Sequence, residues 1–321
     1  MRPAAILSLV VALLGLGFLV RLAWPSGGDG DLVLRSASQC LDCHSGVAAE
    51  WDASQHRNAF LNPEVRKLSN DFQNQECIAC HAPRPVLSFE PGERVLARQS
   101  ERALGVDCLT CHLTPEGGVA ASSPNFDPEA PCRPQQVPRM ASVDLCASCH
   151  NQHGTVDQWR AAPPELKRNN CNDCHMPVAW REGGVKGRAH LFHGGHDLAT
   201  LQAAVTLDAG FDAEGPWVTL TNDGAGHNFP TDERSRAADL QVRWQGEDGS
   251  WGEWQHIYRF RDPYRDETDL TNTQLPSGET ARFPLADTRS GDSGEVRLLY
   301  RTNPFMPDDE AREVARMPLT P

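Results

Sequence analysis

The stretch Cys40-Leu41-Asp42-Cys43-His44 is the first of five copies of one short pattern, Cys-x-x-Cys-His. The other copies occupy residues 77–81, 108–112, 146–150 and 171–175, and together the five use ten of the eleven cysteines. This pattern is the attachment signature of haem c, in which two thiols bond to the vinyl groups of one haem and the histidine binds its iron. We therefore expect five covalently attached haem c groups.

The pattern assigns a role to each of its residues. The expected attachment cysteines are Cys40, Cys43, Cys77, Cys80, Cys108, Cys111, Cys146, Cys149, Cys171 and Cys174. The expected proximal iron ligands are His44, His81, His112, His150 and His175.

Two other roles of paired cysteines explain the pattern less well. Structural zinc sites also use Cys-x-x-Cys pairs, but zinc does not require a histidine directly after every pair. A disulfide within each pair would leave that histidine without a role. Cys132 is the cysteine outside the pattern, and it is either a free thiol or a link to another chain.

The charge balance excludes one class of protein. The 321 residues include 30 Lys and Arg against 43 Asp and Glu, for a formal net charge of −13. Nucleic-acid-binding domains carry a basic stripe, so the sequence predicts no nucleic-acid partner.

A haem iron takes a second axial ligand unless it is kept open for a substrate. Seven of the 12 histidines lie outside the motifs, against five methionines, so the composition favours two histidines per iron with two to spare. The seven candidates are His56, His153, His190, His193, His196, His227 and His256.

Local spacing sorts some of these candidates. On a helix His153 would share a face with His150, so it could serve only a different haem, or it is a surface histidine. Residues 188–196 carry three histidines beside glycines, which suits a loop close to flat cofactors, or a loose surface metal site. His256 alternates with aromatic residues along an expected strand, which predicts a core residue rather than a ligand.

The N-terminal segment points to export. Residues 4–20 carry no charge and are flanked by Arg2 and Arg21, as in a signal peptide or a transmembrane helix. No good cleavage site follows Arg21, and Trp24 stands where an interface anchor would, so an uncleaved anchor over residues 1–24 is favoured. Residues 25–31 read as a flexible linker.

The exported chain divides into two regions, and the expected fold class is α+β. Residues 32–198 hold all five motifs, with too little chain per haem for a conventional core, so we expect short helices and loops around the haems. Residues 199–321 lack cysteine and carry alternating runs at 217–221, 240–244, 256–260 and 296–300, which predict an antiparallel β-sandwich. A short helix is expected over residues 308–316.

Segments beyond the motifs resemble those of the cytochrome c554-related multihaem c-type cytochromes. They are Trp51-x-x-Ser54-x-His56, the stretch 146–153, Cys171-x-x-Cys174-His175-Met176-Pro177, the loop 190–197, and Gly226-His227-x-Phe229-Pro230-Thr231. The resemblance implies electron transfer through closely packed haems, most of which have two histidine ligands. It also implies that the distal ligands are His56, His153, His190, His196 and His227.

These features lead to one main functional hypothesis. We expect a membrane-tethered, periplasm-facing pentahaem electron carrier between a quinol oxidiser or cytochrome and a downstream reductase. One alternative is an oxidoreductase with one open haem acting on a small nitrogen or sulfur species. Another is a subunit of a conducting filament, which the expected anchor argues against.

Overall fold

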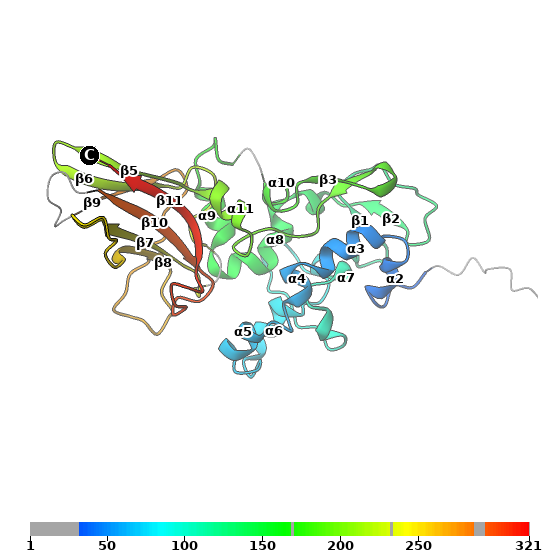
Figure 1. The fold of residues 1–321 in the computed structure, drawn as a ribbon. Coiled ribbons are helices and arrows are strands. Elements are labelled where there is room, and N and C mark those ends of the chain that lie inside the picture. Colours follow the sequence, from blue (N-terminus) through cyan, green and yellow to red (C-terminus); the bar gives the residue numbers. More distant parts are fainter. Residues whose placement is uncertain (1–31, 168–169, 232–233, 286–292, 321) are drawn as a thin grey trace, which may run out of the picture.

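The computed structural model describes residues 32–167, 170–231, 234–285 and 293–320. The expected anchor at 1–24 and linker at 25–31 lie outside these residues. Among the residues described, no helix is both long and apolar enough to cross a bilayer. Figure 1 shows the motif helices gathered toward one end of the molecule and most of the strands at the other.

The motif region consists of short helices and loops, as predicted. Its helices are α2 (Ser38–Leu41), α3 (Ser45–Asp52), α4 (Gln55–Asn58), α5 (Pro63–Leu68), α6 (Gln75–His81), α7 (Cys108–His112), α8 (Val143–His150), α9 (Thr155–Ala161) and α10 (Cys171–His175). Single 3-10 turns are η1 (Val86–Ser88), η2 (Arg102–Leu104), η3 (Pro138–Ala141), η4 (Asn151–His153) and η5 (Glu182–Gly184). Helices this short are not stable by themselves, so tertiary contacts have to hold them.

Two small strand pairs complete this region. Strands β1 (Val119–Ala121) and β2 (Pro134–Gln136) pair in parallel, whereas β3 (Val178–Arg181) and β4 (Val185–Arg188) form an antiparallel hairpin. The hydrophobic core formed by side chains is small in this region. Its buried cluster consists of Phe72, Ile78 and Ala82. Helix α11 (Leu198–Ala204) then leads into the strands (Figure 1).

The C-terminal region forms two antiparallel sheets that share one core. One sheet has the order β11-β10-β7-β8 and the other β5-β6-β9. The strands are β5 (Thr206–Asp212), β6 (Gly215–Thr221), β7 (Ala237–Trp244), β8 (Gln255–Arg261), β9 (Thr280–Pro284), β10 (Gly294–Arg301) and β11 (Arg312–Leu319). This sandwich-like arrangement confirms the antiparallel sheets, and each of the four alternating runs falls within a strand.

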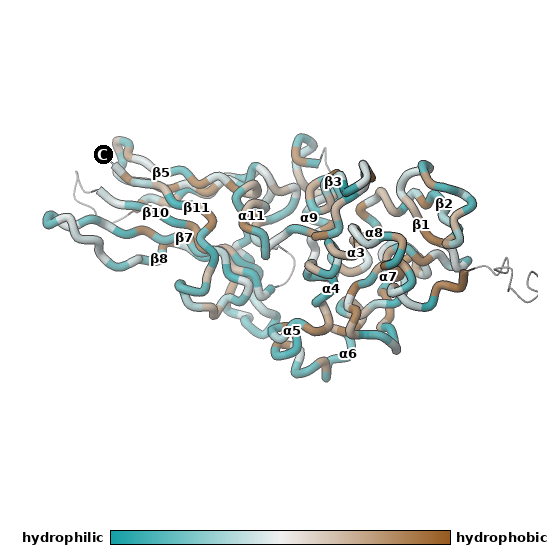
Figure 2. Tube along the Cα trace, turned by 45° about the vertical axis from the view of Figure 1, so that its right-hand side comes forward, coloured by the Kyte–Doolittle hydropathy of each residue, from teal (hydrophilic) through white to brown (hydrophobic). Residues whose placement is uncertain are grey.

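The alternation in sequence produces the sandwich. Figure 2 shows hydrophobic and hydrophilic residues alternating along the strands. Val218 and Leu220 of one sheet and Leu240, Val296 and Leu298 of the other are all fully buried in a single cluster. Because successive side chains point to opposite faces, the polar residues between them face outward.

Two expectations for this region were wrong. Residues 312–316 belong to β11 rather than to a helix, because they pair along β10 and bury Val314. His256 is an exposed residue rather than a core residue. The register of β7 and β8 shifts between Leu240 and Gln241, which pair with Tyr258 and His256, so the regular alternation behind the core prediction is broken there.

Candidate haem-binding site

The last four motifs each form the end of a short helix. Helices α6, α7, α8 and α10 all end at the motif histidine. Residues three apart lie on one side of a helix, so the two thiols of each motif project together. The first motif differs, since α2 ends at Leu41 and His44 occupies the N-cap position of α3 without a capping side-chain hydrogen bond.

Side-chain caps explain why these helices begin where they do. The caps are Asn74, Asp107, Ser142 and Asn170, and each accepts a hydrogen bond from a backbone N–H of the first turn. Such caps satisfy N–H groups that have no partner within the helix. The local sequence therefore starts each motif helix at a defined residue.

Backbone carbonyls hold three of the proximal histidines in one tautomer. The Nδ1–H groups of His81, His112 and His175 donate to the carbonyls of Ala59, Ala120 and His193, at 2.8, 2.8 and 2.5 Å. A carbonyl can only accept, so the proton sits on Nδ1 and the Nε2 lone pair faces away from the bond. This is the arrangement that orients a histidine for metal binding.

The structure brings three motif histidines close to histidines from distant segments. The ring centroids of His56 and His150 lie 6.2 Å apart, those of His112 and His190 6.2 Å, and those of His175 and His227 6.3 Å. The ring planes of these pairs are inclined by 46°, 27° and 12°. Three of the five predicted distal ligands thus each face a different motif.

This spacing fits a metal ion bound between two imidazoles. Metal–imidazole bonds are about 2 Å long, and each ring centroid lies about 1 Å behind its nitrogen, so the centroids should be about 6 Å apart. His190 and His227 also donate from Nδ1 to carbonyls, those of Arg188 and Asn228, both at 2.9 Å. Their Nε2 atoms are therefore the atoms available to a metal.

Burial favours the uncharged form that metal binding requires in one of these pairs, His112 and His190. Burial lowers the pKa of His112. Burial, with a contribution from His112, also lowers the pKa of His190 to about 4. The residues present fit haem c, because they supply thiols for covalent attachment and imidazole pairs at the spacing of two ligands on one metal.

The other predicted histidines have different surroundings. His153 ends η4, directly after α8. His196 lies beside Arg236 and Arg312, and burial together with these two cations lowers its pKa to about 4. His193 Nδ1 lies 3.5 Å from a carboxylate oxygen of Asp197, and His256 Nε2 lies 3.6 Å from one of Asp239. The iron that His153 or His196 would bind stays a prediction.

The comparisons with known proteins agree with this chemistry. Residues 39–113, which include the first three motifs and His56, match the family described as cytochrome c554 and c-prime. This match over part of the chain, together with the five attachment motifs, supports a multihaem c-type cytochrome of the cytochrome c554 family. Haem c is the cofactor of this class, and electron transfer is its general function.

A solved structure shares the fold of this cytochrome. It is that of a penta-haem cytochrome c552 from Thermochromatium tepidum, with a TM-score of 0.64 and 18% identity over 88% of this chain and 98% of that one. No curated protein matches the chain.

Contacts between thiols show which motifs of the cytochrome are neighbours. Cys40 and Cys108 are hydrogen-bonded to each other, as are Cys146 and Cys171. Cys111 lies within electrostatic reach of Cys146. The attachment points of the first and third motifs therefore lie side by side, as do those of the fourth and fifth, with the third near the fourth.

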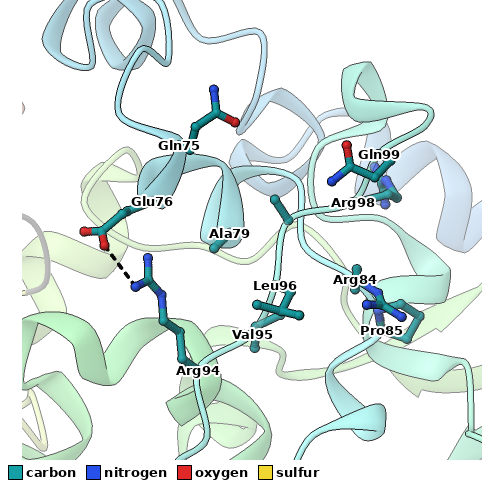
Figure 3. Close-up of a pocket in the computed structure, with 11 residues that line it drawn as sticks. Gln75, Glu76, Ala79, Arg84, Pro85, Arg94, Val95, Leu96, Arg98 and Gln99 are labelled. Carbon is teal, nitrogen blue, oxygen red and sulfur yellow. Dashed lines mark hydrogen bonds and ion pairs between the residues drawn. The ribbon is translucent and has the colours of Figure 1, made fainter.

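A cavity of about 710 Å³ adjoins the second motif (Figure 3). It is bounded on one side by Gln75, Glu76 and Ala79 of α6 and on the other by residues 94–99. With 100° per residue, this face of α6 points away from Cys77 and His81. The cavity therefore lies behind the helix rather than on its attachment face.

Sequence reasoning missed Glu50 as a supporting residue. Its carboxylate accepts the backbone N–H of His190 at 2.8 Å and pairs with Arg181 at 2.6 Å. These bonds tie α3 to the segment that presents His190. Glu50 is far from His190 in the chain, and a single glutamate in a helix carries no local signal of such a contact.

Asp107 links the third motif to Arg98 in the preceding segment, which yields a prediction for stability. Its carboxylate is 3% exposed, caps α7 through Thr110 N–H at 2.9 Å and pairs with Arg98 at 2.7 Å. We expect Asp107→Ala to destabilise the holoprotein by about 3 kcal/mol, because the helix loses its cap and Arg98 its buried partner.

Thermal unfolding of the holoprotein measures this loss. The matched control is Asn62→Ala, which removes the cap of α5 from a half-buried residue and should cost only about 1 kcal/mol. Equal losses in the two variants would contradict a special role for Asp107.

Proposed function

We propose that this cytochrome carries five haem c groups and transfers electrons between redox proteins outside the cytoplasmic membrane. The observation that carries the proposal is the set of three imidazole pairs with centroids 6.2 to 6.3 Å apart. In this assignment His56 pairs with His150, His190 with His112, and His227 with His175. His153 and His196 are the proposed distal ligands for the first and second motifs.

Haem c, when bound, supplies a one-electron ferric–ferrous couple. The residues of the chain would help this ferric–ferrous couple to exchange electrons quickly. The carbonyls of Ala120, Arg188 and His193 hold imidazoles in fixed tautomers, so the ligands need little rearrangement when the charge changes. Burial of His112 and His190 would limit the access of water to a bound iron.

The order of the attachment points supports transfer along the molecule. Neighbouring thiols connect the first motif with the third and the fourth with the fifth, and Cys111 approaches Cys146. The fifth motif faces His227, which belongs to the strand region. We therefore propose that the chain links a site at the first motif with a site at the junction to the sheets.

The partners and location are part of this proposal. Attachment of haem to Cys-x-x-Cys-His in bacteria takes place outside the cytoplasmic membrane, so we propose a periplasm-facing protein, tethered by residues 1–24. A quinol oxidiser or another cytochrome would donate electrons, and a reductase would accept them. With a net charge of −13, association with a basic partner should slow as salt increases.

Haem content and spin state of the purified holoprotein test the proposal. We expect five haems per chain, all low-spin, and no carbon monoxide binding after reduction. Fewer than five haems would contradict the motif assignment. A high-spin haem that binds carbon monoxide would show an open iron and support the alternative oxidoreductase.

A further inference from the structure

Phe192 lies between two of the proposed distal ligands. Its ring centroid is 4.2 Å from that of His56, with the planes inclined by 58°. It is also 5.6 Å from the centroid of His190, in an edge-to-face arrangement at 82°. These histidines face different motifs, the fourth and the third. One aromatic side chain therefore packs against ligands of two separate sites.

The backbone at Phe192 has an unusual conformation. Its φ is +51°, in the left-handed region, which bulky residues other than glycine rarely adopt. Such a conformation costs conformational energy and persists only where surrounding contacts offset it. The ring contacts with His56 and His190 can offset this cost. They also fix the position of the Phe192 ring.

We propose that Phe192 is a positioning residue that holds the ring planes of His56 and His190 together. This inference rests on the proposed function, in which both histidines are axial ligands. Edge-to-face and tilted packing restrict rotation of the imidazoles about their own axes. Contacts behind an axial ligand orient it and tune the metal. Phe192 thereby links the electronic state of the third and fourth sites.

The two sites should respond unequally to the loss of the ring. His190 is also held by the Arg188 carbonyl at 2.9 Å and by the bond from its backbone N–H to Glu50. These bonds remain when Phe192 is replaced. We therefore expect the larger change at the site of His56 and a smaller one at the site of His190. The site of His227 should not change, since His227 donates to the Asn228 carbonyl and faces His175, neither of which is in the segment of Phe192.

The test is Phe192→Leu in the full-length holoprotein, followed by electron paramagnetic resonance and by potentiometric titration of each low-spin signal. We expect full haem content, shifted g values for two of the haems and altered midpoint potentials for the same two. Phe192→Tyr keeps the ring and should restore the wild-type signals. Phe305→Leu is the matched control, because Phe305 is 74% exposed.

Two results would overturn the inference. One is a Phe192→Leu spectrum identical to that of the wild type. The other is a change spread over all signals at full haem content, which would make Phe192 a structural residue. If Phe192→Leu lowers haem content, Phe192→Met supplies a second ringless variant, and the same loss there overturns the inference.

A separate pair of variants distinguishes this inference from the proposed function. His56→Ala and His190→Ala should each convert one haem to high spin. If neither does, the ligand assignment itself fails. If both do while Phe192→Leu leaves every signal unchanged, the assignment stands and only the role of Phe192 fails.

Discussion

Replacing His227 with alanine is expected to convert one haem from low spin to high spin and leave the others unchanged. The rings of His227 and His175 are the most nearly parallel of the three pairs, at 12°. Without His227 the iron held by His175 has no imidazole on its other side. Axial ligands set haem potentials over a range of about 0.8 V, so this haem should shift by on the order of 0.1 V.

Electron paramagnetic resonance and carbon monoxide binding to the reduced protein measure the change. One haem per chain should gain a high-spin signal and bind carbon monoxide. His256→Ala is the matched control, because His256 is an exposed histidine of the same region that faces Asp239 rather than a motif. An unchanged number of low-spin haems in His227→Ala would remove this residue from the ligand set.

The second large effect is expected from Asp239→Asn in the sandwich. Asp239 is 1% exposed and accepts hydrogen bonds from Arg259 at 2.6 and 2.7 Å and from Arg301 at 2.6 Å. Arg301 is itself only 3% exposed. An amide cannot balance these two guanidinium charges, and breaking a buried ion pair costs about 3–5 kcal/mol. We expect a loss of that size.

The effect should depend on pH with a definite sign. Burial alone would raise the pKa of Asp239, but hydrogen bonds from Arg259, His256 and Arg301 outweigh it and hold that pKa well below its usual range. The charged form therefore stabilises the folded state above the unfolded pKa of about 4, and the benefit is lost as the pH falls. The difference between wild type and Asp239→Asn should shrink in acid.

Urea unfolding of the holoprotein, followed by circular dichroism at several pH values, measures both effects. Asp212→Asn is the control, because its ion pair with Arg282 is about half exposed and should contribute less than about 1 kcal/mol. A loss below 1 kcal/mol in Asp239→Asn, or one that is the same at all pH values, would contradict this account.

Several features of the protein follow from local sequence. The five motifs specify attachment because each needs only five consecutive residues, and Asn74, Asp107, Ser142 and Asn170 start the motif helices through bonds within the first turn. The strands follow from alternation and turn residues. The local pattern gave two wrong predictions. The helix expected over residues 308–316 is replaced in part by β11, which pairs with β10. His256 is not a core residue, because the register of β7 and β8 shifts beside it.

The pairing of the histidines was decided by the tertiary structure. His56 follows the first motif closely in sequence, yet it faces His150 of the fourth, and His227 reaches His175 from the strand region. Glu50 and Phe192 act on histidines from other segments. The sequence by itself determined which residues can attach haem and which can serve as ligands, because this chemistry is local. Which histidine meets which motif depends on distances through space, and these exist only once the chain has folded.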